Sequence, residues 1–149
     1  IKAVKQSDSD YMFMLEHDWQ FNKPLIKHSL EEICEIMQKN NIYHLRFNKR
    51  QNIKAGWDTQ FTPTDVNGFK CCISNNMSNN PHIIDRKKYI NEMIKYLKIL
   101  PGSKGIEEEL NKTEKYFSYI YGPENYPATV THLDGRRDDK VRRVKKGRR

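Results

Sequence analysis

The sequence has few cysteines and no long apolar run. Its three cysteines, Cys34, Cys71 and Cys72, do not make a disulfide framework, and their spacing fits neither a CxxC motif nor a zinc ribbon. We therefore expect all three to be reduced structural residues, which suits a cytoplasmic protein. No run approaches about 18 apolar residues, so no membrane span is predicted, and no signal peptide is visible.

Apolar residues are scarce throughout the chain. They make up 36% of the 149 residues, and the mean hydropathy is −0.92, which predicts a thin core under a polar surface. Eight Tyr, six Phe and two Trp nevertheless argue against disorder, and the length suits one domain. The first residue is Ile rather than Met, so we expect the chain to be a piece of a longer one.

The positive charge is concentrated at one end of the sequence. Residues 136–149 hold nine Lys/Arg and two Asp, which gives +7 of the net charge of +8. Such a segment can bind phosphate backbones or anionic membranes, but it has no aromatic residue to stack on bases. We expect a basic, disordered tail at 137–149, and the nearly neutral remainder argues against nucleic acid as the partner.

The order of the expected elements indicates an α/β fold. Residues 11–15 are short and apolar and predict a buried strand. Ser29 and Glu32 form a capping box at the start of a helix, and Asp85 begins a second helix that runs to 97. A third helix is expected at 106–117. Strands are expected at 42–47, 59–62, 69–74, 119–121 and 129–131. We predict a mixed sheet with flanking helices over residues 1–136.

Two carboxylates follow the first predicted strand at once. Glu16 and Asp18 can converge on one hard cation if the backbone turns there, because Mg²⁺ and Mn²⁺ prefer oxygen ligands and share them with substrate phosphates. Ligands in open α/β sheets bind outside the carboxyl ends of strands. The structural alternative is a strand that enters a polar surface loop.

A late histidine and an acidic helix start are further candidates. His132 follows a predicted strand and can join Glu16 and Asp18 on a metal, although a histidine satisfied by a backbone carbonyl explains it equally. Glu107 and Glu108 lie in the first turn of a predicted helix, whose positive end favours acids. Either one could instead serve as a general base.

Other polar residues are weaker candidates for substrate contacts. Arg46 and Asn48 lie near a strand end and could contact phosphate or sugar. Trp57 and Asp58 place an aromatic face beside a carboxylate, a pairing suited to sugars. Arg136 could neutralise a diphosphate leaving group, or it begins the basic tail. Each of these residue types is more often found in packing or on the surface.

Four short motifs together resemble a known family. They are LEHDW at 15–19 after the apolar strand, GIEEEL at 105–110, YGP at 121–123 and THLDGR at 131–136. In this order they resemble the second part of a GT-A glycosyltransferase, of the family-2-like kind found in bacteria and large viruses. The resemblance spans about residues 8 to 136.

The resemblance implies a role for each of these residues. Such enzymes carry a DxD-type motif that holds a divalent metal and the nucleotide-sugar diphosphate, and many add a late histidine. Asp18 would be the main metal ligand, Glu16 would replace the first Asp and contact ribose or metal, and His132 would be the late ligand. Glu108, or else Glu107, would be the base that activates the acceptor.

The implied function is a glycosyltransferase that uses Mn²⁺ or Mg²⁺. It would transfer a sugar from a nucleotide-sugar donor, first of all a UDP-sugar, to a hydroxyl group of a glycan or protein. The nucleotide-binding βαβ half that normally precedes the DxD motif has no counterpart, so we expect a truncated GT-A-like domain. Either it is a fragment, which could be inactive alone, or it has lost the activity, or a partner supplies the rest. The alternatives are a nucleic-acid-binding module that uses the tail and a metal-dependent phosphoryl-transfer enzyme.

Overall fold

A six-stranded mixed sheet forms the body of the protein. The computed structural model describes residues 2–53, 61–94, 97, 105–111 and 118–133. β3 and β7 run parallel, and the other four neighbouring pairs run antiparallel. The sheet order is β1 (Tyr11–Met14), β6 (His82–Asp85), β3 (His44–Arg46), β7 (Ser118–Tyr121), β5 (Phe69–Ser74) and β4 (Phe61–Val66). The prediction of an α/β fold with a mixed sheet is confirmed.

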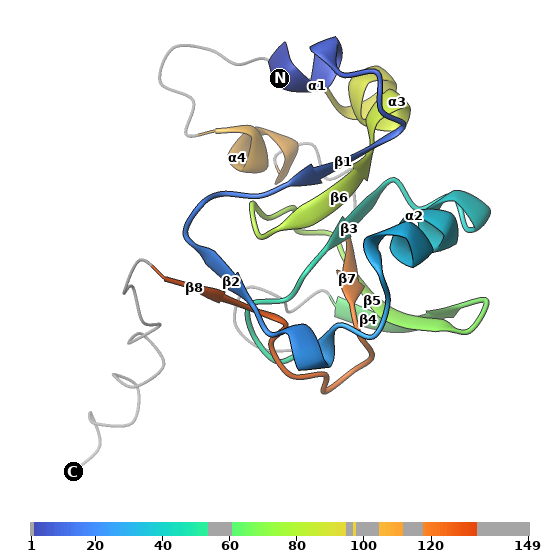
Figure 1. Ribbon diagram of the computed structural model, residues 1–149, viewed down its shortest axis with the longest axis vertical. Helices are drawn as coiled ribbons and strands as arrows, with labels where there is room; N and C mark the ends of the chain where they lie inside the picture. The colour runs from blue at the N-terminus through green and yellow to red at the C-terminus, as the bar shows by residue number, and fades with distance from the viewer. Residues whose placement is uncertain (1, 54–60, 95–96, 98–104, 112–117, 134–149) are drawn as a thin grey trace.

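A second, two-stranded sheet lies beside the first (Figure 1). β2 (Trp19–Phe21) pairs antiparallel with β8 (Val130–His132). The pairing joins a segment near the start of the chain to the last described strand. β2 continues from β1 through a short turn, so the two sheets are linked by the stretch that carries the predicted metal ligands.

Helices cover both faces of the large sheet. Ile83 and Ile84 are neighbours in β6, so their side chains point to opposite faces. Ile83 packs in a cluster with α2, whereas Ile84 packs in a cluster with α1, η3 and α4. The helical elements are α1 (Lys2–Gln6), η1 (Lys23–Leu25), α2 (Leu30–Lys39), α3 (Arg86–Lys88), the π-helical η3 (Tyr89–Met93) and α4 (Ile106–Asn111).

Local sequence signals explain where several elements begin. Ser29 Oγ accepts a hydrogen bond from Glu32 N at 3.2 Å, and Glu32 Oε2 accepts one from Ser29 N at 2.7 Å. This is the predicted capping box at the start of α2. Asp85 Oδ1 accepts from Lys88 N at 3.0 Å and begins α3 as predicted. β4 and β5 meet in a hairpin at Asn67 and Gly68, which both have positive φ values (52° and 89°).

Some predictions of the elements were wrong or incomplete. β1 is an edge strand rather than a buried one, and Phe13 is 37% exposed. The predicted strand at 59–62 extends further as β4. The predicted helix at 106–117 begins at Ile106 as α4, and residues 112–117 lie outside the described residues. α1, β2 and β6 were not predicted.

None of the described helices is both long enough and apolar enough to cross a membrane.

Candidate metal centre

Strand pairing brings the late histidine to the acidic turn. Glu16 and Asp18 lie between β1 and β2, and His132 is the last residue of β8. In the β2–β8 register Trp19 lies opposite His132. Leu133 N also donates to Asp18 O at 2.7 Å. These backbone contacts place the side chains of Asp18 and His132 next to each other.

The three predicted ligands form one cluster. His132 Nε2 lies 2.9 Å from Asp18 Oδ2, and both side chains are about a quarter exposed, at 28% and 27%. One ligand atom from each of Glu16, Asp18 and His132 lies within 4.8 Å of the other two. The Trp19 ring packs on the His132 ring, with centroids 4.4 Å apart. The side chains that the sequence predicted as ligands are therefore close enough to share one ion.

The donor set fits a small divalent cation. Bonds of about 2.1 Å to a six-coordinate ion place adjacent ligand atoms about 3 Å apart and opposite ones about 4.2 Å apart. Asp18 Oδ1 is buried and has no hydrogen-bond partner among the described residues, so an acceptor remains for a cation. Carboxylates suit Mg²⁺ and Mn²⁺, and imidazole favours transition metals. The set therefore fits Mn²⁺ better than Mg²⁺.

The residues predicted as bases lie on a different element. Glu107 and Glu108 are in the first turn of α4. Leu110 anchors this helix in the cluster formed with α1 and η3. Glu107 Oε2 accepts a hydrogen bond from Asn79 N at 3.0 Å, so this carboxylate ties α4 to the loop before β6. The metal cluster includes neither glutamate.

Asn48, which the sequence predicted as a substrate contact, bonds to the backbone near the start of β8. Its side chain is buried and donates to the carbonyl oxygens of Arg50 at 2.8 Å and Pro127 at 3.0 Å. Its backbone O accepts from Thr129 N at 2.9 Å and Val130 N at 3.2 Å. Asn48 thus fixes the start of β8, the strand that carries His132. Sequence reasoning missed this positioning role because it depends on contacts with residues distant in the chain.

The remaining predicted substrate contacts are Arg46, Trp57, Asp58 and Arg136. Arg46 is buried in β3, opposite His82 of β6. Trp57, Asp58 and Arg136 lie outside the described residues.

A pair of buried histidines was not predicted. The rings of His44 and His82 stack with centroids 4.6 Å apart. His44 Nδ1 bonds Ser118 Oγ at 2.8 Å, and His82 Nδ1 donates to Asn80 O at 2.7 Å. Burial, above all, lowers the pKa of both imidazoles, that of His44 well below its usual value. The available signal in the sequence was the strand pattern of IYHLRF at 42–47, which places the polar side chain of His44 within the sheet.

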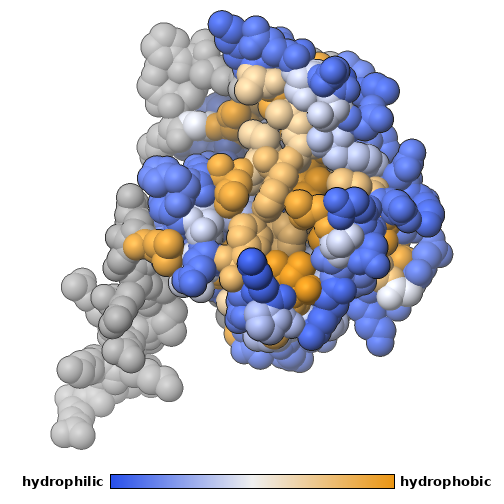
Figure 2. All heavy atoms as spheres, in the orientation of Figure 1, coloured by the Kyte–Doolittle hydropathy of each residue, from blue (hydrophilic) through white to orange (hydrophobic). Residues whose placement is uncertain are grey.

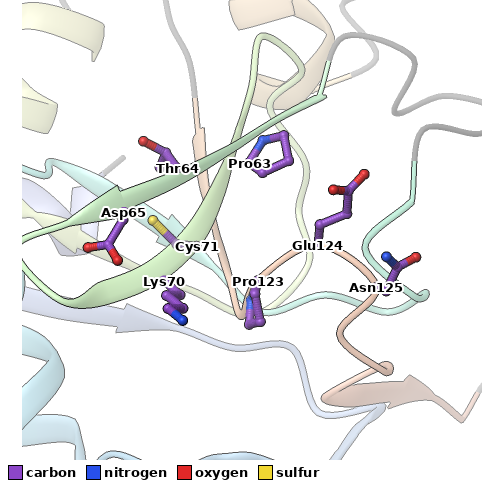
Figure 3. A pocket seen from close by; sticks show the side chains of 8 residues that line it. All are labelled: Pro63, Thr64, Asp65, Lys70, Cys71, Pro123, Glu124 and Asn125. Carbon is purple, nitrogen blue, oxygen red and sulfur yellow. The ribbon is translucent and has the colours of Figure 1, made fainter.

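A shallow groove lies elsewhere on the molecule. It has a volume of about 420 Å³ and lies between the β4–β5 hairpin and the loop that contains Glu124. Figure 3 shows Asp65 and Lys70 on the hairpin side, with Glu124 on the loop side. Burial and the nearby Asp65 raise the pKa of the Cys71 thiol to about 12. None of the predicted site residues lines this groove, so the acidic turn remains the stronger candidate.

All three cysteines are free thiols, as predicted from the sequence.

Comparison with known protein families, curated proteins and solved structures finds no match to this chain. Functional inference therefore depends on the residues of the site.

Proposed function

We propose that Glu16, Asp18 and His132 bind one divalent cation, Mn²⁺ in preference to Mg²⁺. We further propose that the chain is part of a metal-dependent glycosyltransferase. It would transfer a sugar from a nucleotide-sugar donor, first of all a UDP-sugar, to a hydroxyl group of a glycan or protein. The observation that carries this proposal is the meeting of two motifs from opposite ends of the chain in one cluster of ligand atoms.

The resemblance to GT-A enzymes links these residues to the diphosphate of the donor. The order of the motifs in the sequence predicts Glu16, Asp18 and His132 as ligands, and this prediction uses no information on their proximity. The two structural alternatives were a polar surface loop for Glu16 and Asp18 and a histidine satisfied by a backbone carbonyl for His132. Neither alternative requires the three side chains to lie close together. Their proximity therefore supports a shared ligand, and the resemblance supports a metal–diphosphate as that ligand.

Each residue has a distinct task in the proposed reaction. Asp18, whose Oδ1 has no hydrogen-bond partner among the described residues, and the exposed Glu16 would supply oxygen ligands. The Trp19 ring would keep His132 oriented. A bound cation would neutralise charge on the leaving nucleotide. Glu108 would take the proton from the acceptor hydroxyl, because Glu107 already accepts a hydrogen bond from the loop before β6.

A metal-dependent phosphoryl-transfer enzyme is the second candidate. It is favoured by the same observation, because two carboxylates and a histidine also suit metal-assisted attack on phosphate. The two candidates differ in their products. Hydrolysis of a nucleic acid without any sugar acceptor would favour phosphoryl transfer, whereas sugar transfer from a nucleotide-sugar would favour the glycosyltransferase.

Calorimetric titration of UDP, with and without Mn²⁺, tests the proposal. We would titrate this chain and a longer polypeptide that contains it, because the resemblance implies that half of the nucleotide site lies elsewhere. We expect Mn²⁺-dependent binding of UDP that Asp18→Ala and His132→Ala abolish. His17→Ala is the matched control, since His17 lies between the carboxylates but outside the cluster. It should leave binding unchanged.

The titration also separates the two parts of the proposal. Binding of Mn²⁺ without any effect on UDP would support the metal centre and overturn the UDP-sugar donor. If both this chain and the longer polypeptide are folded and neither binds Mn²⁺ or UDP, the whole proposal is overturned. In the longer polypeptide, sugar transfer that persists in Asp18→Ala would remove the assignment of Asp18 as a ligand.

A further inference from the structure

The two-stranded sheet that carries His132 is short. It consists of three pairs of residues, which are Trp19 with His132, Gln20 with Thr131 and Phe21 with Val130. Figure 2 shows both hydrophilic and apolar surface where Figure 1 draws this sheet. A two-stranded sheet on its own is at best marginally stable in water. The register of β8 against β2 therefore needs support from contacts outside the sheet.

The alternation of side chains fixes this register only in part. Val130 is buried, whereas the next residue, Thr131, is exposed. A slip of β8 by one residue would exchange the two faces of the strand, so the burial pattern disfavours it. A slip by two residues leaves every side chain on its own face, but it would move His132 away from Trp19. The pattern alone does not exclude this second slip.

Thr129, the residue before β8, is bound from two sides. Its backbone O accepts a hydrogen bond at 2.8 Å from the N–H of Asn22, which directly follows β2. Its own N–H donates to Asn48 O at 2.9 Å. Asn48 lies two residues after β3, an inner strand of the large sheet. Thr129 thus connects the small sheet to the large one.

The hydroxyl group of Thr129 strengthens this connection. It donates to Asn48 Oδ1 at 2.5 Å and accepts from Asn48 N at 3.1 Å, so one residue satisfies both roles of the hydroxyl. Thr129 is 0% exposed and Asn48 is 5% exposed. A slip of β8 by two residues would break these bonds and leave buried polar groups without partners, which is unfavourable. The bonds to Asn48 therefore select one register among those that the side-chain pattern allows.

We propose that Thr129 is a positioning residue for the candidate metal centre. Its hydroxyl fixes the register of β8 against β2, and this register holds His132 next to Asp18. In the observed register Leu133 N donates to Asp18 O at 2.7 Å, and His132 Nε2 lies 2.9 Å from Asp18 Oδ2. The expected effect on Mn²⁺ binding rests on the proposed metal centre, whereas the effect on the register does not.

Nuclear magnetic resonance can measure the register without metal. The hydrogen bonds donated by Asn22 N and Leu133 N make Trp19 and His132 a non-hydrogen-bonded pair, because the two kinds of pair alternate. The Cα atoms of such a pair lie about 4.5 Å apart, so their Hα protons should show a strong nuclear Overhauser effect, here called the register contact. We expect it in the wild type in the presence of a chelator. A register contact that appears only after Mg²⁺ is added would overturn the proposal, because the ion would then set the register.

Matched threonine variants test the hydroxyl itself. Thr129→Val keeps the shape of the side chain and removes the hydroxyl, and Thr131→Val makes the same change at an exposed position of β8. We expect Thr129→Val to lose the register contact and to bind Mn²⁺ at least about tenfold more weakly in calorimetry, as when contacts that orient metal ligands are removed. Thr131→Val should change neither property. Thr129→Ser, which retains the hydroxyl, should keep both.

The results distinguish a failure of this proposal from a failure of the metal centre. A Thr129→Val variant that keeps the register contact and the Mn²⁺ affinity would overturn the role of Thr129, as would equal losses in Thr129→Ser. Loss of the register contact with unchanged Mn²⁺ affinity would overturn its link to the metal. If the wild type binds no Mn²⁺, the metal centre fails and the register contact alone decides the role of Thr129. The measurement on the metal-free wild type remains decisive if Thr129→Val does not fold.

Discussion

The two sheets of this protein use histidine in opposite ways. In the six-stranded sheet His44 and His82 are 2% and 9% exposed, stack on each other and bond neutral groups. In the two-stranded sheet the His132 side chain is 28% exposed and contacts the carboxylate of Asp18. Burial favours a neutral imidazole, whereas an imidazole that is open to solvent beside carboxylates can receive an ion. Surroundings, rather than residue type, distinguish the structural histidines from the candidate ligand.

The largest expected effect contrasts a buried leucine of the large sheet with an exposed leucine next to the small sheet. Leu45→Ala removes a fully buried side chain from the middle of the large sheet and should lower the free energy of unfolding by about 2–5 kcal/mol. Leu133→Ala changes a leucine that is 58% exposed beside the small sheet and should cost less than about 0.5 kcal/mol. Urea unfolding measures both. Similar costs would mean that Leu133 packs against the protein in solution instead of lying on its surface.

The buried histidines should make the protein sensitive to acid. Burial lowers the pKa of His44 and His82 in the folded state, so the unfolded chain binds more protons once the pH falls below about 6.5. The stabilisation is complete above that pH and is lost below it. The loss continues until the folded histidines also take up protons. With two groups the slope is at most about 2.7 kcal/mol per pH unit.

Substitution of the histidines tests this origin of the acid sensitivity. Unfolding free energies of the wild type and of a His44→Asn, His82→Gln double variant would be compared between pH 7 and pH 5. We expect a flatter profile for the variant, even if its stability at pH 7 is lower. Parallel profiles would assign the acid sensitivity to other groups.

Sequence reasoning succeeded where the signal was local and failed where partners were distant. The capping box of Ser29 and Glu32 is read within four residues, and α2 begins there. β6 was missed because its four residues follow a turn-rich stretch and precede the helix start at Asp85. β2 was missed because it is defined only by its pairing with β8.

The candidate site shows the same division. The residue types and motif order named Glu16, Asp18 and His132 before their proximity was known. The contacts that create this proximity, the β2–β8 register and the bonds from Asn48 to β8, have no local signature. The burial of His44 and His82 likewise arises from strands that are distant in the chain.

The metal centre should change stability only when metal is present. A ligand at about 100 times its dissociation constant stabilises the folded state by about 2.7 kcal/mol, so Mn²⁺ should raise the melting temperature of the wild type. Asp18→Asn should remove this increase, because it replaces the charged ligand. His17→Asn should retain it. An equal Mn²⁺ effect in the wild type and Asp18→Asn would place the ion elsewhere.

The smallest expected effect tests whether α2 and the small sheet, which pack in one hydrophobic cluster, are coupled in metal binding. Ser29→Ala removes the cap of α2, which covers the large sheet, and should cost about 1 kcal/mol. Ser9→Ala is the control, because its side chain caps no helix. Neither variant should alter the affinity for Mn²⁺, measured by calorimetry, because Ser29 bonds Glu32 at the start of α2 and neither serine is a candidate ligand. A weaker affinity in Ser29→Ala alone would show that α2 helps to position the small sheet, and the two histidine environments would then belong to one cooperative unit.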